Sequence, residues 1–355
     1  MFNNIYKNKK VLVTGHTGFK GSWLVNWLSE LGANVIGVSD IVNTQPSHFS
    51  LLESKIEKSI LVDIRNYREI VKIIESYKPE IVFHLAAQAL VKSSYHDPIL
   101  TYETNVIGTL NLLQSCRNNK VKAFLNITTD KVYENKEWIY PYRENDELGG
   151  YDMYSSSKAC SEILTQSFRR SFLKEEGSML LASVRAGNVI GGGDWADNRI
   201  IPDIVRAAST GNITEIRSPL AIRPWQHVLE PLSGYLVVGE NLLNGNSKHA
   251  TSFNFGPNKE LVLTVKELIE ECGNCWDKIR YELKENNDFH EANILKLDCT
   301  KSNSKLGWKP VWNAETTIHK TIGWYKAYYE EGELLTNKDL AAYTSDAKRM
   351  KLNWA

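Results

Sequence analysis

Tyr154 and Lys158, in the string YSSSK, are the first candidates for acid–base chemistry in this sequence. They open a segment with helical periodicity, and positions i and i+4 share one helix face, so the ammonium can lie near the phenol. A phenol has a reference pKa of about 10, and a nearby ammonium or an oxidised nicotinamide ring would lower it. The same spacing also arises by chance on half-exposed helices, so the pair needs a supporting context.

A second set of reactive side chains follows the apolar run in NITTDKVY. Thr129, Asp130 and Lys131 come directly after a stretch typical of a buried strand, so we expect them at the carboxyl end of that strand. A threonine hydroxyl there can hydrogen-bond the substrate oxygen on which Tyr154 acts. Asp130 can also be interpreted as a turn or capping residue.

A glycine-rich loop, GHTGFKG, lies near the N-terminus between the apolar run Val11–Val13 and a helical pattern. Gly15, Gly18 and Gly21 in such a loop bring backbone N–H groups and a helix N-terminus up to a diphosphate. The next apolar run ends at Asp40, where an acid can accept ribose hydroxyls and would repel a 2′-phosphate. The order of these features favours an NAD site over an ordinary tight turn.

The composition excludes several classes of protein. The chain has 355 residues, with 42 lysines and arginines against 42 aspartates and glutamates, so its charge indicates neither nucleic acid nor a membrane as partner. It has no apolar run of about 18 residues and no signal peptide. Five cysteines, including a lone CxxC at Cys272 and Cys275, predict free thiols in a reducing cytoplasm and no metal site.

Six short apolar runs alternate with stretches of helical length in the first half of the chain: VLVTG, NVIGVS, SILVD, EIVFHLAA, AFLNITT and LLASVRAG. This alternation predicts an α/β fold, a Rossmann-like doubly wound parallel sheet with a smaller C-terminal substrate-binding domain. We expect residues 1–190 to form the dinucleotide-binding domain, with a returning segment near 225–260. Residues 191–355 would mainly form the substrate-binding domain. The polar tail from Glu331 has no evident role.

Beyond these local patterns, the chain resembles the extended short-chain dehydrogenase/reductase superfamily through GxxGxxG, HLAAQ, TNVIGT and YxxxK. Within that superfamily it is similar to the CDP-glucose 4,6-dehydratases. The strings that carry this likeness are GHTGFKGSWL, TTDKVYENKEW, GGYDMYSSSK, SVRAGNVIGGGDW, RPWQHVLEPLSGYL and HEANILKLDCTKSNSKLGW. The glycine motif alone is weakly specific, whereas the long strings together are strongly so.

The resemblance implies a set of site residues. Catalysis would fall to Thr129, Asp130, Lys131, Tyr154 and Lys158. NAD would be bound by Gly15, Thr17, Gly18, Phe19, Lys20, Gly21, Asp40, Asp63, Ile64, Leu85, Ala86, Ala87, Gln88, Thr104, Tyr154 and Lys158. The sugar nucleotide would be bound by Gln88, Asn188, Arg199, Arg217, Arg223, His227 and His290. Guanidinium groups suit a diphosphate because they bind it bidentately, although such arginines also form ordinary ion pairs.

The implied activity is NAD-dependent 4,6-dehydration of a nucleoside-diphosphate hexose for deoxysugar and polysaccharide biosynthesis, such as O-antigen or capsule. CDP-glucose is the favoured substrate, giving CDP-4-keto-6-deoxyglucose and water. Two alternatives remain: a 4-epimerase of the same fold, against which Asp130 argues, and a catalytically silent regulatory protein that binds nucleotide sugars. The family's dimer helices would be Pro98–Cys116 and Tyr154–Phe172, which implies a homodimer or a dimer of dimers.

Lys131 stands where the similar dTDP-glucose dehydratases have the glutamate of an Asp–Glu pair. Asp130 fits the acid that protonates the departing hydroxyl, which requires burial to raise its pKa. Lys131 would then be either the base for carbon 5 or a cation that stabilises the enolate, and both roles stay open.

Overall fold

A seven-stranded parallel sheet forms the centre of the computed structural model, which describes residues 1–355 except 43, 53–55, 217, 258–262 and 285–294. The strand order is β11-β6-β5-β4-β1-β2-β3. The six predicted strands are all present: β1 (Lys10–Thr14), β2 (Asn34–Ser39), β3 (Lys58–Leu61), β4 (Ile81–His84), β5 (Ala123–Ile127) and β6 (Leu180–Ala186). The predicted Rossmann-like fold is confirmed.

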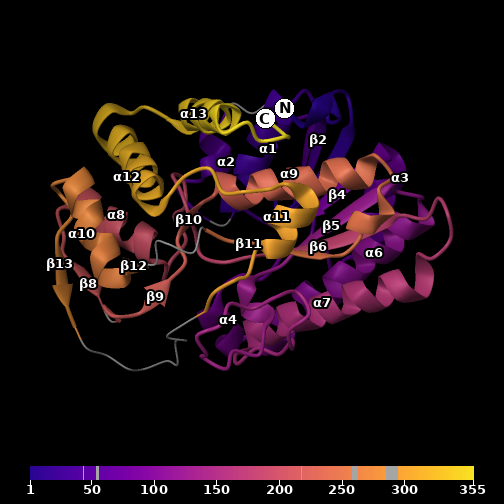
Figure 1. The fold of residues 1–355 in the computed structure, drawn as a ribbon, viewed down its shortest axis with the longest axis horizontal. Helices are drawn as coiled ribbons and strands as arrows, with labels where there is room; N and C mark the ends of the chain where they lie inside the picture. The colour runs from indigo at the N-terminus through magenta and orange to yellow at the C-terminus, as the bar shows by residue number, and fades with distance from the viewer. Residues whose placement is uncertain (43, 53–55, 217, 258–262, 285–294) are drawn as a thin grey trace.

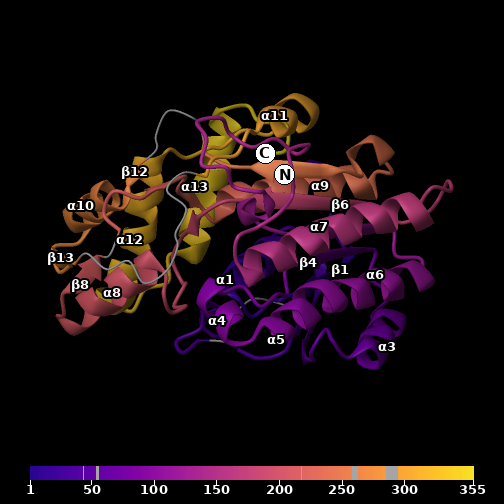
Figure 2. The same ribbon diagram turned by 90° about the horizontal axis from the view of Figure 1, so that it is seen from below.

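Helices cover both faces of this sheet because its central strands are apolar on both sides. Val11 and Val13 of β1 face one layer, which contains α1 (Phe19–Glu30) and α9 (Leu229–Leu243), whereas Leu12 faces the other. The second layer contains α3 (Tyr67–Tyr77), α6 (Thr109–Asn118) and α7 (Met153–Phe172). In Figure 2, which views the molecule from below, α7, α6 and α3 follow one another along this face of the sheet. The central strands are therefore buried on both faces, whereas the edge strand β3 is largely exposed.

A later segment of the chain returns to the sheet. Strand β11 (Ser252–Phe255) pairs in parallel with β6, and α9 packs over the neighbouring strands. This seventh strand was not among the six predicted runs, because SFNF is short and alternates with polar residues. The return of α9 and β11 completes the sheet on the side of β6.

The second lobe contains α8 (Ile200–Thr210), α10 (Val265–Cys275) and α12 (Ala314–Glu331), together at the left of Figure 1. Short strand pairs complete it and join it to the sheet. They are β8 (Thr214–Ile216) with β13 (Tyr281–Leu283), β9 (Ile222–Arg223) with β12 (Leu263–Thr264), and β7 (Val189–Ile190) with β10 (Gln226–His227). The remaining helices are α2 (His48–Leu51), α4 (Val91–His96), α5 (Pro98–Tyr102), α11 (Thr300–Leu306) and α13 (Thr336–Arg349), with a π-helical segment at Glu103–Gly108. Among the described residues, no helix is both long and apolar enough to cross a membrane.

The polar C-terminal tail packs back onto the N-terminal segment and α1. The ring of Trp354 stacks on Phe2 with centroids 5.2 Å apart, and the Phe2 N–H donates to the Trp354 carbonyl at 2.6 Å. Helix α13 contributes Tyr343, which meets Trp27 of α1 edge to face. The two chain ends therefore lie side by side (Figure 1). Residues from 336 onward contact α1 as well as α12 of the second lobe, through Trp27 and Lys320 respectively.

Candidate active site

The glycine loop at residues 15–18 connects β1 to α1 and passes against the end of β4. A Cβ on Gly15, whose φ is +74°, would lie 2.7 Å from the Ala86 nitrogen, and one on Gly21 would collide with the Gly15 carbonyl. The N-cap of α1 is Gly18, so no side chain caps the first N–H groups of that helix. Side-chain-free backbone and an uncapped helix N-terminus form a cradle that fits a diphosphate.

This loop lies where the direction of the sheet reverses. The chain runs outward through β1, β2 and β3, and then crosses to β4 on the other side of β1. Ligands of open α/β sheets bind at such switch points, beyond the carboxyl ends of the strands. The predicted residues Leu85, Ala86 and Ala87 follow β4 at this position, half-buried against the loop.

The end of β2 forms the adjoining part of the site. The Thr17 N–H donates to Ser39 Oγ at 3.2 Å, and the Thr17 hydroxyl donates to the Ile41 carbonyl at 2.7 Å. These bonds attach the glycine loop to the strand end that exposes Asp40. Asp63 is engaged by a partner that the sequence did not indicate, since Arg65 binds its carboxylate at 2.6 Å and holds its pKa below the usual range.

Asn105 is a site residue that sequence reasoning missed, although the quoted string TNVIGT contains it. It is buried in the π-helical segment, where its Oδ1 accepts the Gln88 N–H at 2.9 Å and its Nδ2 donates to the Gln88 carbonyl at 3.0 Å. Its Nδ2 also lies 2.9 Å from the Ser157 hydroxyl of α7. Asn105 thus fixes the loop after β4 to the helix that carries Tyr154. The neighbouring predicted residue, Thr104, is half-buried.

The first turn of α7 presents Tyr154. The helix begins at Met153 because the Asp152 side chain caps it, accepting the Ser155 N–H at 2.9 Å. One turn later, the buried ammonium of Lys158 donates to the Ile127 carbonyl at the end of β5, at 2.9 Å. The YxxxK helix is thereby attached to the strand that leads into the second reactive set.

Thr129, Asp130 and Lys131 follow β5, as predicted, and form a short 3-10 turn. The Thr129 hydroxyl donates to Asp130 Oδ1 at 2.9 Å and lies close enough to the Tyr154 phenol to lower its pKa. Asp130 is buried, whereas Lys131 is half-buried with its charge facing Asp130. Of the five predicted catalytic residues, the structure therefore brings Thr129, Asp130 and Tyr154 together, with Lys131 beside Asp130. Lys158 is bound to the end of β5, one helical turn from Tyr154.

Burial shifts the protonation of this group. It raises the pKa of Tyr154 to about 12, against the opposing effects of the Thr129 hydrogen bond and the Arg199 charge. This direction is opposite to the lowering that a base role for the phenol requires. Burial also lowers the pKa of Lys158 and that of Lys20 to about 8. The pKa of Asp130 is raised by burial although Lys131, Thr129, Lys20 and Arg223 oppose the shift.

The second lobe brings two arginines toward this group. Arg199 directly precedes α8, and its guanidinium forms an ion pair with the Asp194 carboxylate at 2.8 Å. Asp194 therefore holds Arg199 in place, a role that the sequence did not indicate. Arg223 of β9 is close enough to Asp130 for its charge to lower the pKa of that carboxyl. Asn188 is half-buried beside Gly187, where a Cβ would lie 3.0 Å from Asp130 Oδ2. Arg199 and Arg223 of the second lobe therefore act on the same group as Lys20 at the start of α1.

A family model described as GDP-mannose 4,6 dehydratase matches residues 12–321 of this chain. The chain belongs to the sugar-nucleotide 4,6-dehydratase family. A CDP-glucose 4,6-dehydratase of Salmonella typhimurium is 46% identical over 355 residues, which cover 98% of this chain and 99% of the relative. A dTDP-glucose 4,6-dehydratase of Haemophilus influenzae is 28% identical, over 89% of this chain and 97% of the relative.

Solved structures share the architecture of this dehydratase. A UDP-glucose 4-epimerase of Thermotoga maritima superimposes with a TM-score of 0.79 at 25% identity, covering 90% of this chain and 100% of the other. The dTDP-glucose 4,6-dehydratase DesIV of Streptomyces venezuelae gives a TM-score of 0.76 at 22% identity, covering 91% and 100%. The fold alone does not separate epimerases from dehydratases, so the catalytic residues must do so.

His227, predicted at the sugar nucleotide, is fully buried in this structure. Its ring lies 4.9 Å from that of Trp312 and 5.8 Å from that of Trp23. Burial lowers its pKa to about 3. Its contact with the sugar nucleotide stays a prediction. Arg217 and His290 lie outside the described residues.

Gln88, predicted to contact both ligands, hydrogen-bonds within the protein through its side chain. Its amide donates to the Thr101 hydroxyl at 2.9 Å and accepts the Leu90 N–H at 2.6 Å. Ile64, predicted at the cofactor, is buried where a Cβ on Gly108 would clash with it. Both residues therefore shape the loops around the cradle through contacts within the protein.

The cysteines are free thiols, as predicted. Cys275 of the CxxC lies beside a pair formed by Glu271 and His319, whose carboxylate and ring nitrogen are 2.8 Å apart. This hydrogen-bonded pair already satisfies the ring nitrogen without an ion.

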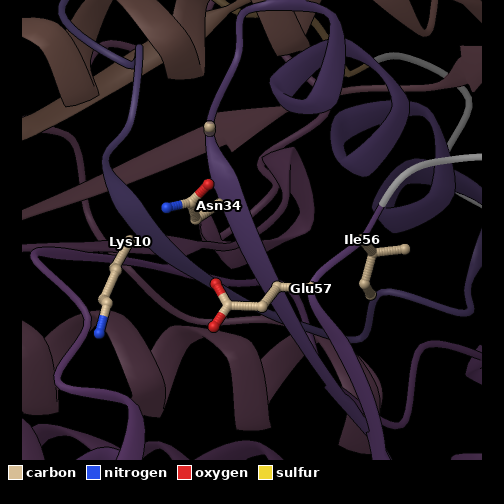
Figure 3. Close-up of a pocket in the computed structure, with 5 residues that line it drawn as sticks. Lys10, Asn34, Ile56 and Glu57 are labelled. Carbon is tan, nitrogen blue, oxygen red and sulfur yellow. The ribbon is translucent and has the colours of Figure 1, made fainter.

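A hollow of about 590 Å³ lies at the opposite edge of the sheet (Figure 3). It is lined by Lys10, Ala33, Asn34, Ile56 and Glu57. Lys10 and Asn34 are the first residues of β1 and β2, so this hollow adjoins the amino ends of the strands, away from the glycine loop. It is unrelated to the catalytic group.

Gly15→Ala should disrupt the cradle. The added methyl group would meet the Ala86 nitrogen and would also sit at a positive φ, so we expect loss of copurified dinucleotide and a lower melting temperature. Gly211→Ala is the matched control, because Gly211 also has a φ of +74° but has no atom within 4 Å of its Cβ position. The control should lose only about 1 kcal/mol of unfolding free energy. Equal nucleotide content in the two purified variants would contradict the cradle.

Proposed function

We propose that this chain is an NAD-dependent CDP-glucose 4,6-dehydratase that forms CDP-4-keto-6-deoxyglucose and water, for deoxysugar and polysaccharide biosynthesis in the cytoplasm. The observation that carries the proposal is the joining of Thr129 and Tyr154 with a buried Asp130 beside the glycine cradle. An epimerase needs the first two groups but no acid for an elimination. The identity to the Salmonella typhimurium CDP-glucose dehydratase, at 46%, supports CDP-glucose as substrate.

The cradle fits a dinucleotide, and the exposed Asp40 favours NAD over NADP because it would repel a 2′-phosphate. A bound NAD would supply the hydride acceptor for carbon 4 of the sugar and, once reduced, the hydride donor for carbon 6. The predicted contacts of Lys20, Phe19, Asp63 and Thr104 with NAD are part of this proposal.

Tyr154 is proposed to take the proton of the carbon 4 hydroxyl, while Thr129 holds the same oxygen. The phenol must lose its own proton first, and burial alone opposes that loss. The guanidinium of Arg199 and the Thr129 hydrogen bond already lower the pKa, and Lys158 lies one turn away on the same helix face. Base catalysis by Tyr154 therefore depends on added positive charge in the closed site.

Asp130 is proposed to protonate the hydroxyl that leaves carbon 6. Burial raises its pKa, which keeps the carboxyl protonated further toward neutral pH, as an acid catalyst requires. Lys131 faces this carboxyl and acts at carbon 5, as base or as the cation beside the enolate. Asn188, Arg199 and Arg223 are proposed to bind the nucleotide sugar, with the arginines at its diphosphate.

Incubation with CDP-glucose should yield a product lighter by one water, detected by mass spectrometry. An inverted sugar of unchanged mass would identify an epimerase, and an unchanged substrate would identify a binding protein. A panel of other nucleoside-diphosphate hexoses tests the base and the sugar.

Tyr154→Phe should keep the fold and bound NAD but lose turnover by about 100-fold or more, because it removes only the acid–base hydroxyl. Near-native turnover in this variant would exclude Tyr154 as the base.

Lys131→Met should separate the two halves of the reaction. We expect this variant to oxidise carbon 4, with NADH absorbance building up, but to stall before water is lost. In deuterated water, a base role for Lys131 predicts no exchange of the carbon 5 proton. Exchange at the native rate together with blocked dehydration would assign Lys131 to a later step.

We also propose that the enzyme is a homodimer, or a dimer of dimers, formed through the helices at 98–118 and α7. Several apolar side chains on these helices are exposed: Ile99, Ile107, Leu110, Ile163 and Phe172. Ile163 on α7 is 53% exposed. A surface with several exposed apolar side chains favours burial against a second copy of the chain.

Light scattering at micromolar concentration should give a dimer or larger mass for the native chain. Ile163→Glu should shift this mass toward the monomer, because it places a charge in the apolar contact. Ile213→Glu changes the same residue type at 55% exposure in the second lobe and should leave the assembly intact. A native monomer would refute the dimer.

A further inference from the structure

A buried ion pair lies beneath the catalytic group and takes no direct part in the proposed reaction. Glu162 of α7 and Arg185 of β6 are each 2% exposed, and their charged atoms are 3.0 Å apart. Removing two charges from water is costly, and well-packed apolar residues often stabilise a core as well as such a pair does. The contacts that these two side chains make indicate what the pair contributes.

The Glu162 carboxylate reaches the strand that leads into the catalytic segment. Its Oε1 accepts the Thr128 hydroxyl at 2.6 Å, and its Oε2 accepts the Ser183 hydroxyl at 2.7 Å as well as Arg185 Nη2. Thr128 directly precedes Thr129. Glu162 therefore fixes the backbone at the amino end of the segment 129–132.

The Arg185 guanidinium reaches the residue that follows the same segment. Its Nη1 donates to the Tyr133 hydroxyl at 2.8 Å, and the guanidinium carbon lies 5.0 Å from the centre of the Tyr133 ring. The Tyr133 hydroxyl in turn donates to Asn254 Oδ1 at 2.8 Å. Arg185 therefore fixes the carboxyl end of the segment 129–132 and ties it to the returning strand β11.

We propose that Glu162 and Arg185 are positioning residues that hold the catalytic segment 129–132 at both of its ends. The segment needs such support, because its own 3-10 turn closes with a long backbone hydrogen bond of 3.4 Å from Tyr133 to Asp130. Acid–base groups must be held close to their productive geometry, and errors of about 1 Å are expensive. The expected effect of these two residues on activity rests on the proposed dehydration reaction.

The position of Glu162 in α7 gives the arrangement a second consequence. Tyr154, Lys158 and Glu162 recur at four-residue spacing along this helix, so the Tyr–Lys pair and the Thr–Asp segment share one rigid support. The charge of Glu162 also opposes the lowering of the Lys158 pKa by burial.

The test removes one hydroxyl from each end of the segment and leaves both buried charges in place, since deleting either charge would leave the other unpaired. Thr128→Val removes the bond to Glu162, and Tyr133→Phe removes the bond from Arg185. The matched control is Tyr142→Phe. The native Tyr142 ring stacks on Tyr133 with centroids 5.1 Å apart, but its hydroxyl accepts the Lys136 N–H, which lies beyond the segment.

We expect kcat to fall about tenfold in Thr128→Val and in Tyr133→Phe, with KM within about twofold of the native value, and Tyr142→Phe to keep the native kcat. Independently of any sugar, hydrogen–deuterium exchange of the backbone at 129–133 should be faster in the first two variants and unchanged in the control.

Native exchange at 129–133 in both test variants would overturn the positioning role, as would faster exchange without loss of kcat. An equal fall in kcat for the control would assign the effect to the aromatic stack instead. If the native chain dehydrates no nucleoside-diphosphate sugar, the proposed function fails, and the exchange measurement alone then decides whether the ion pair holds the segment.

Discussion

Burial of charge at one edge of the sheet is the constraint on which the active site depends. Loss of hydration is the largest cause of the pKa shift at Lys20, Lys158, Asp130 and Tyr154 alike. The two lysines shift down to about 8, while the carboxyl and the phenol shift up, so each group moves toward its neutral form. A site in this condition responds strongly to any further charge, because little water is left to screen it.

The fold supplies this burial from two directions. On the side of the sheet, the bond from Lys158 to the Ile127 carbonyl joins α7 to β5. The buried Glu162–Arg185 pair joins α7 to β6 nearby. From the other direction, the second lobe adds Arg199, which Asp194 holds in place, and Arg223. Asp194 is anchored in turn, since the Tyr325 hydroxyl of α12 donates to its carbonyl at 2.6 Å. The cations that face the catalytic group are therefore set by the packing of a distant helix.

Local patterns in the sequence were sufficient for the six strands, the glycine cradle and the Tyr154 helix, because each depends on residues close together in the chain. Contacts between segments far apart in the sequence could not be predicted from such local patterns. Trp354 packs on Phe2 from the opposite end of the sequence, so the sequence alone suggested no role for the tail. Asn105 hydrogen-bonds the backbone of Gln88, which no local pattern indicates. The burial of His227 was likewise not evident, because similarity of a string does not reveal which way a side chain in a two-residue strand points.

The Asp130–Lys131 order imposes a demand on the fold that an Asp–Glu order would not. A neighbouring carboxylate raises the pKa of an aspartate, whereas the ammonium of Lys131 lowers that of Asp130. Lys20 and Arg223 act in the same direction, so burial must overcome three cations to keep the acid protonated. An anionic diphosphate near Arg199 and Arg223 would offset part of that positive charge, and linkage requires proton binding and ligand binding to favour each other. In the proposed reaction, Asp130 is therefore protonated most readily when the nucleotide sugar is bound, which is the state in which its proton would be used.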